Sequence, residues 1–325
     1  MRYIPSYELN IIAEEQFSDA IADVEAQLEK VKHSGNFVTF DSLKMYYEYF
    51  LAENSRGNIV IVHGLSEFTK KFYEFIYYAL NQGYNVFIYD QRCHGLSERL
   101  TKFKDLLHVD DFFDYEKDLE YFIDEIVLKT EDKPLYLYAH SMGGAVAALY
   151  LAKNNQKIKK AILSAPMLEP VVKDAPAFLA RASVQLGKVF LGPKHKFFLS
   201  KEFDPNVAFN YAYGLSKARF DFNMKMRREN PNYQSTPMSY GWVSNSLTIG
   251  KKILNPKIIN KIVTPILIIS ARDDKVVKND VQKEFFEKCK SCRFESIEYA
   301  THAILASHEK ILLESLTLTF DFMAS

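Results

Sequence analysis

A serine enclosed by small residues between an apolar stretch and a helical pattern constrains this chain more than any other feature. The apolar stretch from Pro134 to Tyr138 leads into Ala139-His140-Ser141-Met142-Gly143-Gly144, and a helix-forming run continues to Tyr150. In such a nucleophile elbow the strand and the helix nearly touch, so the residues two before and two after the serine must be small. Ala139 and Gly143 meet that requirement. An ordinary strand-loop-helix corner would also fit this hexapeptide, so other parts of the chain must decide.

Strand and helix patterns alternate along most of the chain. Helical spacing over 15–32 is followed by two β-rich segments, 36–40 and 44–52, which indicate a hairpin. Further strands are expected at 59–62, 85–89, 136–138, 161–163, 266–270 and 293–299, and further helices at 69–81, 110–128, 142–153, 277–290 and 302–323. This alternation predicts an α/β protein with a mostly parallel central sheet and helices on both faces.

One long segment interrupts this alternation. Residues 166–254 are rich in aromatic residues, methionines and paired basic residues, and they lie between two expected sheet strands. We therefore expect an inserted helical cap at 166–254, a core formed by 36–165 and 255–325, and an N-terminal helical extension at 1–35. A cap above the elbow would shape a substrate pocket.

Composition excludes several classes of protein. The chain has 325 residues, of which 48% are hydrophobic and 25% charged, and its 41 Lys and Arg balance its 41 Asp and Glu. This balance gives no reason to expect a nucleic-acid partner. The first eight residues lack the pattern of a signal peptide, and no apolar run is long enough to span a bilayer, so we expect a cytoplasmic protein. The cap near residues 178–190 is the candidate for transient contact with a membrane surface.

The cysteines and glycines suggest no cofactor. Three cysteines do not indicate a disulfide framework, and Cys289 and Cys292 form a lone CxxC with no second pair to complete a zinc site. No glycine-rich phosphate loop follows the first strand of the alternating pattern. We expect neither a metal nor a nucleotide nor a flavin.

A serine nucleophile needs a base, an acid that orients the base, and donors for the oxyanion. The strand 265–270 ends before Asp273 and Asp274, and either could be the acid; we assign Asp274. The strand 294–299 ends before His302, and we expect His302 to be the base. We expect it at the start of the last helix. His308 would lie inside that helix at the surface. The serine, the acid and the base each follow the carboxyl end of an expected strand, which is where open α/β sheets bind ligands. Their order along the chain, with the serine first and the histidine last, also fits a serine at a nucleophile elbow.

The oxyanion donors are expected from two backbone amides. Residues 59–62 run directly into His63-Gly64-Leu65, where the glycine lets the backbone turn back over the elbow. The N–H groups of Leu65 and Met142 would then point at one carbonyl oxygen. We interpret His63 as a structural histidine that bonds the loop backbone.

These residues resemble the α/β-hydrolase group that contains monoacylglycerol lipases and bacterial lysophospholipases, over most of the chain from about Phe37. The segments 67–74, 90–97 and 108–112, and in the cap Arg219-Phe220 and 236–242, are similar to the lysophospholipase branch. The resemblance implies that Ser141 is the nucleophile, Asp274 the acid and His302 the base. Cys93, Ala139 and Ala271 stand where the family usually has glycine, and all three are small replacements.

The resemblance implies an α/β-hydrolase fold and a serine ester hydrolase that cleaves a lysophospholipid or a monoacylglycerol through an acyl-enzyme. We expect Tyr240 and Trp242 of the cap, and His140 beside the elbow, to contact the substrate. A short-chain carboxylesterase or thioesterase with the same residues is the alternative enzyme. A catalytically silent α/β-hydrolase fold that binds a ligand is the alternative from another class. A carboxylate nucleophile, as in haloalkane dehalogenases, is disfavoured by the serine at the elbow.

Overall fold

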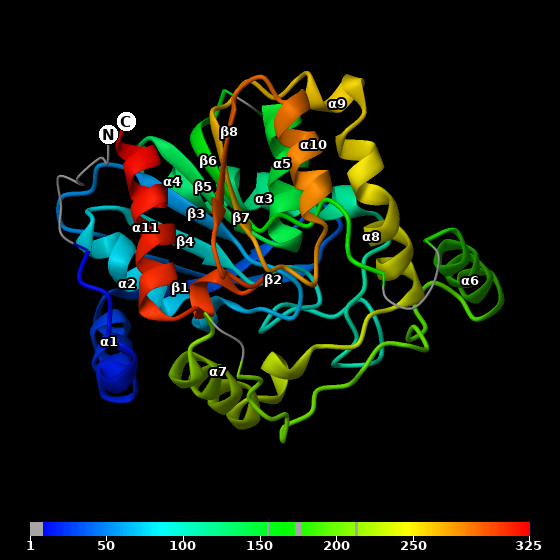
Figure 1. Cartoon of the computed structure of the whole chain (residues 1–325), viewed down its shortest axis with the longest axis horizontal. Coiled ribbons are helices and arrows are strands. Elements are labelled where there is room, and N and C mark those ends of the chain that lie inside the picture. Colours follow the sequence, from blue (N-terminus) through cyan, green and yellow to red (C-terminus); the bar gives the residue numbers. More distant parts are fainter. Residues whose placement is uncertain (1–8, 155, 173–176, 212–213) are drawn as a thin grey trace.

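The centre of the structure is an eight-stranded sheet with the strand order β1-β2-β4-β3-β5-β6-β7-β8 (Figure 1). The computed structural model describes residues 9–154, 156–172, 177–211 and 214–325, so residues 1–8, on which the signal-peptide expectation rests, lie outside it. The strands are β1 (Lys32–Val38), β2 (Lys44–Phe50), β3 (Asn58–Val62), β4 (Asn85–Tyr89), β5 (Leu135–His140), β6 (Ile158–Ser164), β7 (Ile266–Ala271) and β8 (Cys292–Ile297).

The strand register aligns the loops that carry the expected site residues. β1 and β2 form the predicted antiparallel hairpin, and β2 also runs antiparallel to β4. From β4 to β8 all neighbouring strands are parallel. Val62 pairs with Ala139, and His140 pairs with Ser164. The carboxyl ends of β3, β5 and β6 therefore lie at one edge, where the loops that follow them meet.

Helices cover both faces of the sheet because its buried strands alternate two sets of apolar side chains. Ile59 and Ile61 pack in one cluster with α1 (Phe17–Val31), α2 (Tyr73–Asn81) and α11 (Glu309–Ala324). Val60 and Val62 pack in the other with α3 (Phe112–Phe122), α5 (Met142–Asn154), α8 (Tyr240–Ile253) and α10 (Asn279–Lys288). Figure 1 shows the sheet between these helices. The predicted α/β-hydrolase fold is confirmed.

Several further helical elements are short. They are η1 (Glu14–Gln16), η2 (Thr69–Phe72) before α2, the π-helical turn η3 (Ile123–Val127) and α4 (Leu128–Thr130) after α3, α9 (Pro256–Ile259), and η5 (Ile304–Ala306). The single helix predicted over 110–128 is thus α3 with a π-helical turn near its end.

Two expectations near the C-terminus are wrong. His302 does not begin the last helix: it lies in the loop before η5, and α11 begins at Glu309. His308 is the N-cap residue of α11 rather than a residue within it, and its backbone N–H donates to the carbonyl of Gly214. The isolated turn of η5 breaks what reads in sequence as one continuous apolar helix.

Cys289 and Cys292 form a disulfide that the sequence did not predict. Cys289 caps the C-terminus of α10, and Cys292 begins β8. The pair closes a single tight loop between these two elements.

The segment between β6 and β7 contains α6 (Ala177–Phe190), α7 (Lys217–Glu229), η4 (Pro231–Gln234) and α8, followed by α9. Figure 1 shows α6 and α7 at the periphery, whereas α8 lies against the helices of the core. The cap boundaries at 166 and 254 remain a prediction. Among the described residues, no helix combines the length and the apolarity needed to cross a membrane.

A buried arginine joins the N-terminal segment, the core and α7. Arg219 of α7, 4% exposed, donates two hydrogen bonds to Glu74 of α2, at 2.6 and 2.9 Å, and one to the carbonyl of Ile12. Glu14 accepts from the backbone N–H of Ala218 and from the hydroxyl of Ser216. This network ties the inserted segment to α2 and to the N-terminal segment.

Candidate active site

The turn at Ser141 is as tight as the sequence requires. Ser141 has a φ of 52°, a left-handed conformation that costs a non-glycine residue energy and recurs at functional sites. A Cβ atom at Gly143 would lie 2.0 Å from the carbonyl oxygen of Val62, and one at Gly144 would lie 2.6 Å from the Cβ of Pro166. Ala139, where the family has glycine, is fully buried and accommodated. Strand, turn and helix therefore hold the serine at the carboxyl edge of the sheet.

Ser141, His302 and Asp274 form one chain of hydrogen bonds. The Nε2 of His302 lies 2.8 Å from the Oγ of Ser141, and its Nδ1 lies 2.7 Å from Oδ2 of Asp274. Because an ionised carboxylate only accepts, Nδ1 carries the ring proton and Nε2 is left to accept from the serine hydroxyl. This direction of the hydrogen bonds lets His302 take the proton of a serine nucleophile.

Asp274 is held in its ionised form. Its side chain is fully buried, and burial alone would raise its pKa. Hydrogen bonds from His302 and from the N–H groups of Val277 and Val276, together with the attraction of His302, hold the pKa of Asp274 below its ordinary value instead. Asp273, the other candidate, is exposed, and its backbone N–H donates to the carbonyl of Ala300. The geometry therefore brings Asp274, and not Asp273, to the histidine.

The two expected oxyanion donors border the serine. Met142 is the first residue of α5, so its N–H has no acceptor within the helix. Leu65 lies in the loop after β3, and in the described parts of the chain no acceptor is found for its N–H. A Cβ atom at Gly64 would lie 3.0 Å from the Cβ of Ser141, so this loop packs directly on the elbow.

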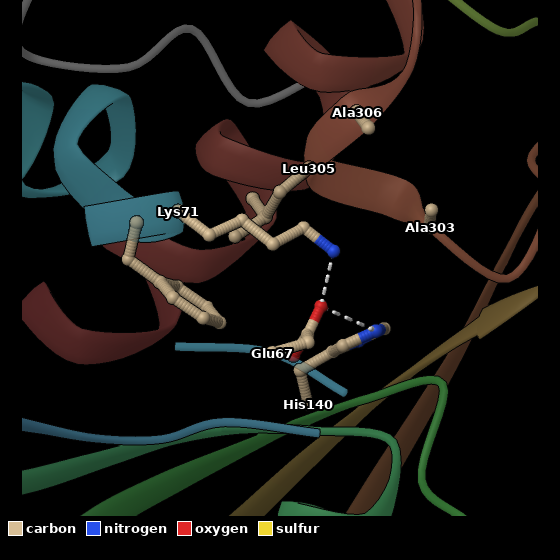
Figure 2. Close-up of a pocket in the computed structure, with 7 residues that line it drawn as sticks. Glu67, Lys71, His140, Ala303, Leu305 and Ala306 are labelled. Carbon is tan, nitrogen blue, oxygen red and sulfur yellow. Dashed lines mark hydrogen bonds and ion pairs between the residues drawn. The ribbon is translucent and has the colours of Figure 1, made fainter. Parts of the chain in front are cut away.

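A small pocket opens beside this chain of hydrogen bonds (Figure 2). It is lined by Glu67, Lys71, Phe72, His140, Ala303, Leu305 and Ala306. Oε1 of Glu67 lies 2.6 Å from Nζ of Lys71 and 3.8 Å from Nε2 of His140. Burial lowers the pKa of His140 to about 4, so the ring is neutral near pH 7. The structure thus gives the pocket one charged pair beside a neutral histidine.

The other two predicted substrate contacts lie elsewhere. Trp242 is 3% exposed and packs against Phe112 of α3, and Tyr240 is 4% exposed and packs against Phe197. Both are on α8 within the apolar cluster of its core-facing side, and neither lines the pocket beside His140. Their contact with substrate stays a prediction.

Sequence reasoning did not assign any role to Glu67 and Lys71. Glu67 was used only as part of a family motif, yet its carboxylate also accepts a hydrogen bond from the N–H of Gly64. An acidic residue three positions after the glycine of this turn is the signal that would have drawn attention to it.

Comparison with known proteins places this geometry among hydrolases. A family model described as "Serine aminopeptidase, S33" matches residues 53–310. The chain is 28% identical to the probable lysophospholipase L2 of Haemophilus influenzae over 277 residues, which cover 83% of this chain and 85% of that protein. It is 27% identical to lysophospholipase L2 of Escherichia coli strain K12, covering 79% and 75%. The predicted resemblance is confirmed.

Solved structures agree with the fold. The crystal structure of a soluble variant of monoglyceride lipase from Saccharomyces cerevisiae, in complex with a substrate analogue, has a TM-score of 0.73 at 21% identity, covering 90% of this chain and 94% of that one. The monoacylglycerol lipase of Paleococcus ferrophilus has a TM-score of 0.64 at 20% identity, covering 84% and 96%.

Proposed function

Because the chain belongs to the serine aminopeptidase, S33 family of hydrolases, we propose that it hydrolyses the ester of a single-chain acyl glycerolipid, a lysophospholipid or a monoacylglycerol. The observation that carries this proposal is the hydrogen-bond chain from Ser141 through His302 to Asp274. The names of the relatives support the choice of substrate class.

In the proposed reaction, Nε2 of His302 takes the proton of the Ser141 hydroxyl while the serine oxygen attacks the ester carbonyl. The carbonyl oxygen becomes an oxyanion that accepts from the N–H groups of Leu65 and Met142. The ester C–O bond then breaks, and His302 returns the proton to the leaving glycerol oxygen. Asp274 remains ionised and stabilises the imidazolium throughout.

Water completes the cycle. It attacks the acyl-serine carbonyl while His302 removes one of its protons, and the collapse of the second oxyanion releases the fatty acid and restores the Ser141 hydroxyl. Each step moves a proton between His302 and an oxygen, so no redox partner is required.

The substrate class is tested by comparing hydrolysis rates on a lysophospholipid and a monoacylglycerol with the same long acyl chain. A p-nitrophenyl butyrate arm tests the short-chain alternative, and an aminoacyl anilide arm tests the peptidase chemistry in the family description. We expect the lysophospholipid to be cleaved fastest, and each long-chain lipid to exceed the butyrate roughly tenfold or more in kcat/KM, because an enzyme for single-chain lipids gains binding energy from the acyl chain.

The Ser141→Ala variant gives the blank for every arm. A preference for butyrate over both lipids would contradict the substrate proposal and favour a short-chain esterase. A preference for the anilide would replace it with peptidase chemistry. A faster monoacylglycerol rate would keep the ester mechanism and reassign the head group.

We also propose that the outer side of α6 contacts a membrane that contains anionic lipids. Val184 is buried, Gln185 donates to Ser244 of α8, and Gly187 packs on Tyr240, so this side of α6 faces α8. The opposite side exposes large apolar residues: Leu186, Val189 and Phe190 are 59, 76 and 80% exposed. α6 carries Arg181 and Lys188, and Lys194, Lys196 and Lys201 follow it, of which Lys196 pairs with Glu202. A helix that exposes an apolar side and has basic residues on it and after it is suited to lie in an anionic lipid interface.

We expect the protein to co-sediment with phosphatidylcholine vesicles that contain phosphatidylglycerol, and less with pure phosphatidylcholine. Replacing two exposed side chains (Val189→Ser/Phe190→Ser) should weaken this binding roughly tenfold or more, because less apolar surface enters the lipid. Val263→Ser is the control for the loss of an exposed apolar side chain outside α6. Val263 is 63% exposed and lies in the loop between α9 and β7. Equal losses in both proteins, or no vesicle binding by the wild type, would refute the membrane contact.

A further inference from the structure

The loop from His63 to Glu67 carries the N–H of Leu65. The three polar backbone groups that precede this N–H, the His63 carbonyl, the Gly64 N–H and the Gly64 carbonyl, are all fixed by hydrogen bonds to buried side chains. The following inference rests on the proposed function, in which Leu65 donates to the oxyanion. The three groups belong to two planes, those of the His63–Gly64 and Gly64–Leu65 peptides. Since a trans peptide is rigid, fixing both planes fixes the direction of the Leu65 N–H.

The first plane is held at both ends. The side-chain amide of Gln91 donates to the carbonyl oxygen of His63, and the N–H of Gly64 donates to Oε2 of Glu67 at 2.6 Å. All of these groups are buried: His63 and Gln91 are fully buried, and Glu67 is 6% exposed. In such surroundings a hydrogen bond to a carboxylate is among the stronger kinds.

The second plane is held by the ring of His63. The backbone N–H of Gln91 donates to Nε2 of His63 at 2.9 Å, so the neutral ring carries its proton on Nδ1. Nδ1 lies 2.8 Å from the carbonyl oxygen of Gly64 and donates to it. In a trans peptide the carbonyl and the following N–H point in opposite directions, so this bond turns the Leu65 N–H away from the His63 ring.

Glu67 is ionised where it makes this contact. Burial alone would raise its pKa, but the attraction of Lys71 and the hydrogen bonds from Lys71 and Gly64 hold the pKa of Glu67 well below its ordinary value. Figure 2 shows the Glu67 carboxylate between the Lys71 ammonium and the His140 ring. Lys71 therefore balances the charge of Glu67 by pairing with Oε1, while Oε2 accepts the hydrogen bond from the N–H of Gly64.

We propose that Glu67, together with His63, is a positioning residue for the oxyanion donor: it fixes the Gly64 backbone so that the Leu65 N–H is aimed at the reacting carbonyl. Glu67 acts through Gly64 and does not exchange a proton with the substrate. Its effect belongs to the transition state, because only there does the carbonyl oxygen carry the full charge that the donor stabilises.

Two double variants separate the acceptor from the ion pair. Glu67→Gln/Lys71→Met removes both charges and keeps an amide oxygen that can accept from Gly64. Glu67→Leu/Lys71→Met removes both charges and the acceptor. The assays are kcat and KM on p-nitrophenyl butyrate, the inhibition constant of a trifluoromethyl ketone that adds to serine as an oxyanion, and the melting temperature.

We expect the Leu variant to lose about ten- to a hundredfold in kcat with KM within about twofold, a part of the cost of deleting one oxyanion donor. The inhibition constant of the ketone should rise by the same factor. The Gln variant should stay within about threefold of the wild type in both. Glu67→Ala/Lys71→Met removes the same acceptor with less side-chain volume and carries the same expectation if the Leu variant does not fold.

Equal activity in the Gln variant and the variants without an acceptor, whether high or low, would overturn the proposal, because the acceptor would then not matter. A fall in melting temperature without a matching change in kcat and ketone affinity would overturn it in favour of a structural role. Failure of the proposed function is distinguishable, because ester hydrolysis would then be absent from the wild type or would survive Ser141→Ala.

Discussion

Ser141→Ala is expected to lower ester turnover on the order of 10⁶-fold, to the level of the assay blank. The variant removes the hydroxyl that lies 2.8 Å from Nε2 of His302, and with it the acyl-enzyme. The fold should remain, because alanine at this position keeps the same backbone, including the φ of 52°, and loses no other hydrogen bond of the side chain. Initial rates on a long-chain monoacylglycerol, with the melting temperature, measure both effects.

Ser246→Ala is the matched control for this variant. Ser246 is 2% exposed and donates its hydroxyl proton to the carbonyl of Val243 within α8, so it tests the loss of a buried serine hydroxyl away from the elbow. We expect turnover within about threefold of the wild type. A fluorophosphonate should label the wild type and the control, but not Ser141→Ala. Substantial turnover in the Ser141 variant would rule out the serine mechanism.

The inner strands β3 and β4 were predictable because each is a short apolar run bounded by turn residues. β4 has the predicted bounds, 85–89, and β3 differs from its prediction by one residue. These strands are buried on both faces, so their apolar runs are nearly continuous. The order of the strands in the sheet was not predicted, because no single run contains it.

What could not be predicted depends on contacts between distant segments. Residues 302–323 read as one helix, yet the chain turns once at η5 and begins α11 at Glu309, where Gly214 of the inserted segment accepts from His308. No local pattern contains this contact. The disulfide between Cys289 and Cys292 is a local feature instead, and a CxxC spacing alone fits a disulfide, a metal site or free thiols alike.

The candidate site was predicted unevenly for a similar reason. Ser141 is recognised from the small residues beside it, and a Cβ at Gly143 would indeed strike the Val62 carbonyl. Tyr240 and Trp242 were assigned to the substrate on motif alone, and in the structure both face the core. Glu67 contacts the Gly64 backbone through a hydrogen bond that composition cannot reveal.

The choice between Asp273 and Asp274 was open in the sequence and leads to the second large effect. We expect Asp274→Asn to lower kcat by about 10⁴-fold. Oδ1 of Asp274 accepts from the N–H groups of Val276 and Val277, at 2.8 and 3.0 Å. An asparagine must keep its oxygen on these two donors, so its NH₂ group faces Nδ1 of His302. The histidine proton is then forced onto Nε2, which can no longer accept from Ser141.

Asp273→Asn removes the same charge one residue away and is the control. Its side chain is exposed, so we expect kcat within about twofold of the wild type. The two variants are compared by kcat on one long-chain ester and by the rate of labelling with a fluorophosphonate, which should fall together in Asp274→Asn. If Asp273→Asn were the slow variant, Asp273 would be the acid, and the loop after β7 would have to rearrange to bring it to His302. Because the substitutions are chemically identical, a difference between them reports the position of the carboxylate and not the loss of a charge.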